Sequence, residues 1–113
     1  MNGGGEIGSE KENVRATFGF TISYKAGDPA PKGNFTYQDH VAKLRLKAQS
    51  FDLLVVKDNH AWITGIGLLD DGKEVKFFVE ISTAPDTLRI LIPELDGYEA
   101  GGALSGGNLS IHK

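Results

Sequence analysis

The sequence predicts an all-β domain of about eight short antiparallel strands in a meander, forming either a small β-barrel or a two-layer β-sandwich. Three observations support this. Apolar residues recur at every second position in several segments, which is the period of a strand with one buried face. Turn-forming residues such as Asp-Asn and Asp-Gly separate these segments at short intervals. No segment has a sustained period of 3.6 residues, so no helix is expected.

The segment 13–25 is the clearest predicted strand. Its alternate positions are all apolar, namely Val14, Ala16, Phe18, Phe20, Ile22 and Tyr24. Polar or small residues occupy the positions between them, so one face is expected to lie in the core and the other in water. A loop should follow over 26–33, because its two prolines and two glycines would interrupt pairing.

Six further strands are expected in order along the rest of the chain. Alternation and turn signals place them at 34–38, 41–50, 51–57, 61–69, 74–83 and 87–92. The segment 93–107 is rich in glycine and acidic residues and is expected to be a loop. A last short strand is predicted over 108–112, and Ile7 is expected to add an edge piece near the amino terminus.

The middle strands carry a second set of apolar residues, in opposite phase to the first. The set is Leu54, Val56, Trp62, Ile66, Leu68, Phe78 and Leu91. One interpretation is that loops, the termini or the second layer of a sandwich cover this face. The other is that the face is exposed and is used for self-association or for contact with a neighbouring domain. Exposure of all seven apolar side chains to water would cost a small domain much of its stability, so another molecule is expected to cover part of this face.

Composition limits the setting of this domain. At 113 residues the chain fits one domain, 1–113, and it has no cysteine and therefore no disulfide. The net charge of −3 argues against a nucleic-acid partner, and no apolar run reaches the roughly 20 residues of a membrane-spanning helix. The start at Met1-Asn2-Gly3 suggests a domain excised from a larger protein.

Candidate metal ligands are scattered along the sequence. The histidines His40, His60 and His112 could bind zinc if the fold brought them together, but their spacing matches no ligand motif. Calcium is the second metal considered, because acidic residues crowd the loops at Asp70, Asp71, Glu94, Asp96 and Glu99. Surface histidines and solvated acids are the simpler interpretation, so no cofactor is expected.

Candidate ligand-binding residues are mainly aromatic. Trp62 and Tyr98 could stack on sugar rings, whereas Tyr24 and Tyr37 fall in phase with core residues. The cations Lys43, Arg45 and Lys47 share one face of a predicted strand and are interpreted as a solvated outer face. No motif selects a nucleophile or a general base, so no catalytic residue is assigned.

Several sequence motifs resemble a known family. The segments that carry the resemblance are Gly3-Gly4-Gly5-Glu6-Ile7, Ala16-Thr17-Phe18-Gly19-Phe20, Gly33 to His40, Leu53-Leu54-Val55-Val56 and the glycine-rich carboxyl-terminal stretch Gly101 to Lys113. Together they resemble the post-COAP type domains of large secreted or cell-surface proteins of bacteria and archaea. The resemblance implies an extracellular, modular setting beside repeat or adhesive domains, and it supplies no catalytic residues.

The sequence therefore predicts a non-catalytic extracellular module with a structural or adhesive role in a larger surface protein. The alternative is a ligand-binding or carbohydrate-binding β-barrel module that uses its interior mouth or Trp62. The partners expected are neighbouring domains, a second copy, or a glycan.

Overall fold

Eight antiparallel strands make up the computed structural model, which describes residues 2–9, 14–23, 31–41, 43–83, 86–95 and 97–110. The strands are β1 (Asn2–Ser9), β2 (Val14–Ser23), β3 (Lys32–Asp39), β4 (Leu44–Lys57), β5 (His60–Leu69), β6 (Glu74–Ser82), β7 (Thr87–Ile92) and β8 (Tyr98–Ser110). Each strand pairs with the next, and β8 pairs with β1, which closes the barrel. The all-β prediction is confirmed, and of the two predicted architectures, barrel and sandwich, the structure is the small closed barrel. The described residues contain no helix that is long and apolar enough to cross a membrane.

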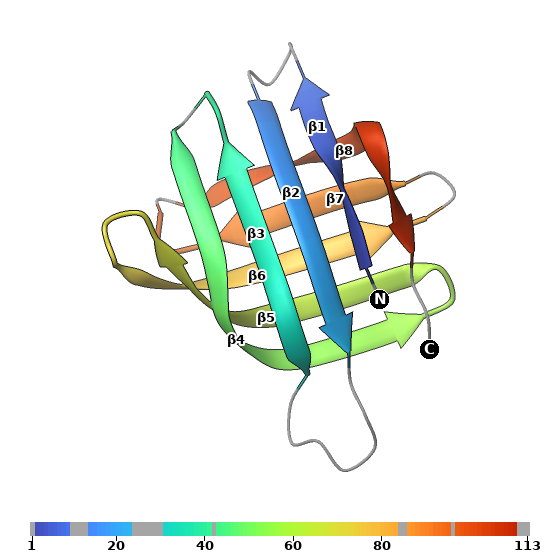
Figure 1. Ribbon diagram of the computed structural model, residues 1–113, viewed down its shortest axis with the longest axis horizontal. Helices are drawn as coiled ribbons and strands as arrows, with labels where there is room; N and C mark the ends of the chain where they lie inside the picture. Colours follow the sequence, from blue (N-terminus) through green and yellow to red (C-terminus); the bar gives the residue numbers. More distant parts are fainter. Residues whose placement is uncertain are drawn as a thin grey trace.

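The barrel is flattened into two walls. In Figure 1, β1, β2, β3 and the first half of β4 form the near wall, and the second half of β4 with β5, β6 and β7 forms the far wall. The strands of the two walls cross at a steep angle, and the molecule measures 41 × 33 × 18 Å. The walls thus pack face to face as in an orthogonal sandwich, while the closed ladder removes the free strand edges.

Strand β4 joins the two walls. The sequence predicted separate strands over 41–50 and 51–57, which is wrong: one strand runs from Leu44 to Lys57. Its pairing with β5 shifts between Ala48 and Ser50 and again between Phe51 and Leu53. Each shift is a β-bulge, and bulges bend a strand and increase its twist. The bend lets one strand belong to both walls.

Strands β1 and β8 close the barrel, and both are longer than the sequence pattern predicted. The predicted edge piece at Ile7 is a full strand, and most of the predicted loop 93–107 is strand β8. The two backbones approach closely: a side chain on Gly107 would place its Cβ 2.1 Å from the Gly4 carbonyl oxygen. Gly107 also has a φ of 91°, which favours glycine. Glycine is therefore required at this seam, although it is a poor strand former.

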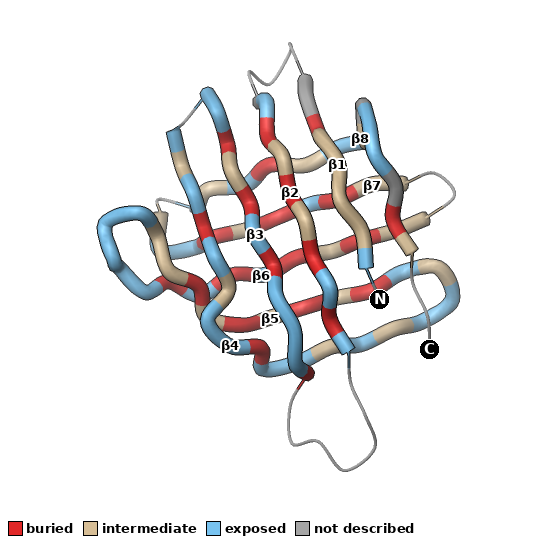
Figure 2. The backbone as a smooth tube through the Cα atoms, in the orientation of Figure 1, coloured by how far each residue is buried: buried red, intermediate tan, exposed pale blue. Residues whose placement is uncertain are grey.

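The interior is filled by side chains from every strand. The alternation predicted for 13–25 is confirmed where it is described, because Ala16, Phe18, Phe20 and Ile22 are buried; Tyr24 lies outside the described residues. Figure 2 shows buried positions alternating with exposed ones along both walls. A row of aromatic rings crosses the core, with neighbouring centroids 5.7–6.3 Å apart, through Phe18, Phe20, Phe35, Phe77 and Phe51. Such spacing is typical of favourable ring contacts.

Candidate functional site

The outer surface of the far wall carries large apolar side chains. We call this surface the outer apolar face and define it by Leu53, Val55, Trp62, Ile66, Phe78 and Leu91. Leu53 is 50% exposed, Val55 42% and Phe78 39%, and the other three are half-buried. Only one other large apolar residue in the described chain, Val41, is comparably exposed. Exposed apolar residues are thus concentrated on one face.

The register of strands β4 to β7 places these residues in rows across the face. One row pairs Leu53 with Thr64, Thr64 with Phe78, and Phe78 with Leu91. The next row toward Lys57 pairs Val55 with Trp62 and Trp62 with Glu80. Neighbouring strands lie about 4.8 Å apart, so the members of a row are in contact distance of one another. The face is therefore a continuous patch.

The predicted second apolar face is correct for β5, β6 and β7 but wrong for β4. Leu54 pairs with Ile63 and Val56 with Ala61, and both of those partners are buried in the core. Leu54 and Val56 therefore point inward, and Leu53 and Val55 take their place outside. The reason is the bulge between Phe51 and Leu53, because its extra residue reverses which side chains face the core after the buried Phe51. Polar Gln49 and Asp52 at these shifts are the one sequence signal that could have indicated this.

Trp62, a predicted ligand-binding residue, lies near one end of the outer apolar face. Its indole Nε1 donates a hydrogen bond of 2.7 Å to Oε2 of Glu80 on the neighbouring strand. The His60 ring stacks on the indole, with centroids 5.7 Å apart and an angle of 17° between the planes. These two contacts fix the orientation of the indole. Sequence reasoning missed Glu80, which fixes this orientation.

Charged residues flank the apolar centre of the face. On β6, Lys76 and Glu80 lie two positions before and two positions after Phe78, so all three point outward. Lys76 lies beside Ile66 and Glu80 beside Trp62. On β7 and β8, Arg89 pairs with Glu99 at 3.0 Å. The exposed phenylalanine is thus bracketed by one positive and one negative side chain along its own strand.

Tyr98, the other predicted ligand-binding residue, belongs to an internal hydrogen-bond network. Its hydroxyl donates to Oδ2 of Asp39 at 2.5 Å and lies 2.7 Å from the hydroxyl of Tyr37. Asp39 is only 2% exposed, and its Oδ1 accepts a bond of 2.9 Å from the Val41 backbone N–H. A buried carboxylate held by such bonds closes one end of the core rather than offering an open mouth. Sequence reasoning missed the burial of Asp39, although position 39 continues the alternation of the inward Phe35 and Tyr37.

Burial raises the pKa values of both phenols. Desolvation is the largest cause for Tyr37 and raises its pKa to about 12, with the Asp39 charge adding to the rise. Desolvation also raises the pKa of Tyr98 above its ordinary value, and the hydrogen bonds to Asp39 and Tyr37 raise it further. Both hydroxyls are therefore neutral hydrogen-bonding groups at physiological pH.

The three histidines considered as zinc ligands are not brought together where they are described. His40 follows β3, and its Nε2 lies 3.2 Å from the Thr17 hydroxyl. His60 opens β5 beside Lys57, at the far end of β4 from the segment that pairs with β3. His112 lies outside the described residues. In the described ranges, no three histidine, aspartate or glutamate side chains are grouped so that they could hold a metal ion.

The described acids considered for calcium are spread over two separate connections and strand β8. Asp70 and Asp71 lie in the β5–β6 turn, where Asp71 Oδ1 accepts the Lys73 backbone N–H at 2.9 Å. Glu94 lies between β7 and β8, and Glu99 is the partner of Arg89; Asp96 lies outside the described residues. Lys43, Arg45 and Lys47 are exposed, as expected for a solvated outer face.

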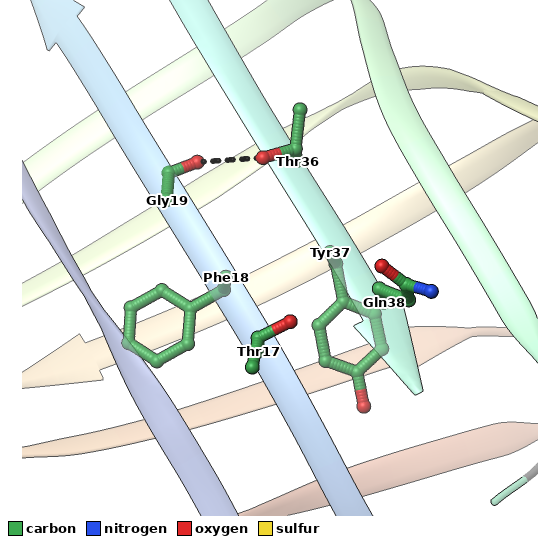
Figure 3. A pocket seen from close by; sticks show the side chains of 6 residues that line it. All are labelled: Thr17, Phe18, Gly19, Thr36, Tyr37 and Gln38. Carbon is green, nitrogen blue, oxygen red and sulfur yellow. Dashed lines mark hydrogen bonds between the residues drawn. The ribbon is translucent and has the colours of Figure 1, made fainter. Parts of the chain in front are cut away.

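A shallow hollow of about 270 Å³ lies on the outside of the near wall. Gly19 leaves the space, and Thr17, Thr36 and Gln38 border it with hydroxyl and amide groups (Figure 3). Phe18 and Tyr37 also line it, although their rings belong to the core. The Thr36 hydroxyl donates to the Gly19 carbonyl oxygen at 3.4 Å. The sequence did not single out this polar hollow.

Comparison with known proteins adds nothing to this geometry. No family model matches the chain, and neither a curated protein nor a solved structure matches it. The fold and its surfaces define the class as a small closed β-barrel with a filled interior and one apolar outer face.

Proposed function

We propose that the chain is a non-catalytic module that works through its outer surface, with a structural or adhesive role in a larger extracellular protein. One observation carries the proposal: in the described part of the chain, three of the four markedly exposed large apolar residues lie together on the outer apolar face. Exposed apolar patches of this kind mark interaction sites, because water-exposed apolar area is costly. The packed aromatic interior supports the same conclusion, since it leaves the outside as the working surface.

The extracellular setting is supported by the sequence resemblance to post-COAP type domains. Surface proteins of this kind are exposed to antibody on intact cells. Antibodies against the chain should therefore label unpermeabilised cells of the source organism or their culture medium. Labelling that appears only after permeabilisation would contradict the extracellular part of the proposal.

The working surface can be tested with an apolar dye. The folded chain at low concentration should bind anilinonaphthalene sulfonate, and the double change Leu53→Ser and Phe78→Ser should reduce the bound fluorescence several-fold. Val41→Ser is the matched control, because Val41 is 45% exposed but lies outside the outer apolar face. Equal dye binding by all three proteins would show that the face is not an accessible apolar surface.

A second candidate function is carbohydrate binding at the polar hollow on the near wall. Its support is the border of hydroxyl and amide groups from Thr17, Thr36 and Gln38, which are suited to sugar hydroxyls. A ligand that binds the folded state raises the melting temperature, so a thermal-shift screen with soluble oligosaccharides tests it. A saturable shift that is lost in Gln38→Ala would favour this candidate over the outer apolar face.

A further inference from the structure

The charges around Phe78 form a pattern that is complementary to itself. Lys76 and Glu80 are equally spaced on either side of the exposed Phe78 along β6. If a second copy lies face to face with its β6 antiparallel, Phe78 meets Phe78 and each Lys76 meets Glu80 of the partner copy. With β6 parallel, like charges would meet instead. Isologous dimers join one surface to itself about a two-fold axis, so this pattern suits only the antiparallel arrangement.

Strand β5, which pairs with β6, is arranged about the same two-fold axis. Thr64 is the partner of Phe78 in the sheet, and Trp62 and Ile66 lie two positions to either side of it. A two-fold axis that passes through the row of Leu53, Thr64, Phe78 and Leu91 therefore places Trp62 against Ile66 of the partner copy. Apolar side chains then meet apolar side chains, and the charged pair forms beside them. Two strands thus independently give complementary contacts about one axis.

We propose that the outer apolar face binds a second copy of the chain, a proposal that rests on the role proposed above for this face. The two copies pack antiparallel about a two-fold axis at Phe78, with two Lys76–Glu80 pairs between them. Four strands about 4.8 Å apart are roughly 15 Å across, and the five residues from Lys76 to Glu80 span roughly 14 Å along a strand. The face therefore covers roughly 200 Å², well below the roughly 800 Å² per partner of a standard stable complex. The association is therefore weak, and it suits a module whose copies are held at high local concentration.

Sedimentation velocity of the full chain at about 10 μM and about 500 μM tests the association by mass action. We expect mainly monomer at the lower concentration and a substantial dimer fraction at the higher one. Lys76→Glu and Glu80→Lys each place like charges opposite each other twice, so each should weaken association at least about tenfold. The double variant Lys76→Glu with Glu80→Lys restores opposite charges and should regain dimer formation.

Two controls separate association from folding. Glu80→Gln keeps an acceptor for the Trp62 indole while removing the charge, so it should weaken the dimer less than Glu80→Lys. Each variant must show the wild-type circular dichroism spectrum at the lower concentration. Wild-type monomer at both concentrations, or no rescue by the double charge swap, would overturn the two-fold dimer. Either result leaves the proposed function standing if dye binding still depends on Leu53 and Phe78.

Discussion

Tyr37, Tyr98 and Asp39 introduce polar groups into one end of an otherwise apolar interior. The two phenols and the carboxylate form a connected set of hydrogen bonds, with Tyr98 as the donor to Asp39. A buried polar group is costly unless it is paired, so this set is stable only as a whole. It also links β3 to β8, which are far apart in sequence.

The buried phenols predict a loss of stability in alkali. The pKa of Tyr37 is raised to about 12 in the folded state, whereas an unfolded tyrosine has a pKa near 10. Above pH 10 the unfolded chain therefore binds fewer protons, and the contribution of Tyr37 to the free energy of unfolding should fall by about 1.4 kcal/mol per pH unit until the folded pKa is reached. The contribution is fully present below pH 10. Urea unfolding at several pH values between 8 and 11.5 measures it.

Tyr37→Phe is the matched control for the alkaline prediction. The variant lacks the titrating hydroxyl, so its free energy of unfolding should fall less steeply above pH 10 than that of the wild type. Tyr98 remains in the variant and contributes with the same sign, because its pKa is also raised. Identical slopes for the two proteins would show that the Tyr37 hydroxyl is not buried in the folded state.

At the scale of the elements, β4 decides which side chains the far wall presents. The first bulge reverses the phase of the strand so that Phe51 is buried, and the second reverses it again, so that Leu54 packs against the core and Leu53 is half exposed. The apolar run Leu53-Leu54-Val55-Val56 does not reveal this phase, because either phase places apolar side chains on both faces. The outer apolar face thus depends on this one strand.

Adjacent leucines give a direct test of the phase of β4. Leu54→Ala should lower the free energy of unfolding by about 2 kcal/mol, because it removes partly buried packing against the core. Leu53→Ala should change it by less than about 0.5 kcal/mol, since exposed substitutions are usually near neutral. Urea denaturation followed by circular dichroism measures both. A larger loss of stability for Leu53→Ala than for Leu54→Ala would show that Leu53, and not Leu54, packs against the core.

At the scale of the whole molecule, the pairing of β1 with β8 turns a curved sheet into a barrel. The seam brings the two ends of the described chain together, and Asp86 supports it from the β6–β7 connection. Its carboxylate accepts the Leu109 backbone N–H at 3.2 Å, and its carbonyl oxygen accepts that of Leu104 at 3.1 Å. Closure leaves no free edge, so the barrel should unfold as one unit.

Two adjacent glycines test the seam. Gly107→Ala combines a left-handed φ with a backbone clash, so it should destabilise the fold by about 3 kcal/mol. Gly106→Ala meets nothing within 4 Å and should cost under about 1 kcal/mol. Circular dichroism and Trp62 fluorescence should report one coincident transition in both variants, although Trp62 lies on the far wall. A fluorescence transition that Gly107→Ala leaves unchanged would mean that the seam opens separately.

The sequence by itself determined the all-β class, most of the turns and the inward face of β2, β3, β5, β6 and β7. These features depend on local alternation, which a single strand shows without its neighbours. The tertiary structure alone decided that β4 is one bent strand, that glycine-rich β8 pairs with β1, and that Asp39 is buried. Bulges, close backbone approach and a paired buried carboxylate depend on partners distant in sequence, so local alternation alone does not establish them. The outer apolar face combines both: alternation placed Trp62, Ile66, Phe78 and Leu91 on it, and the bulge after Phe51 in β4 added Leu53 and Val55.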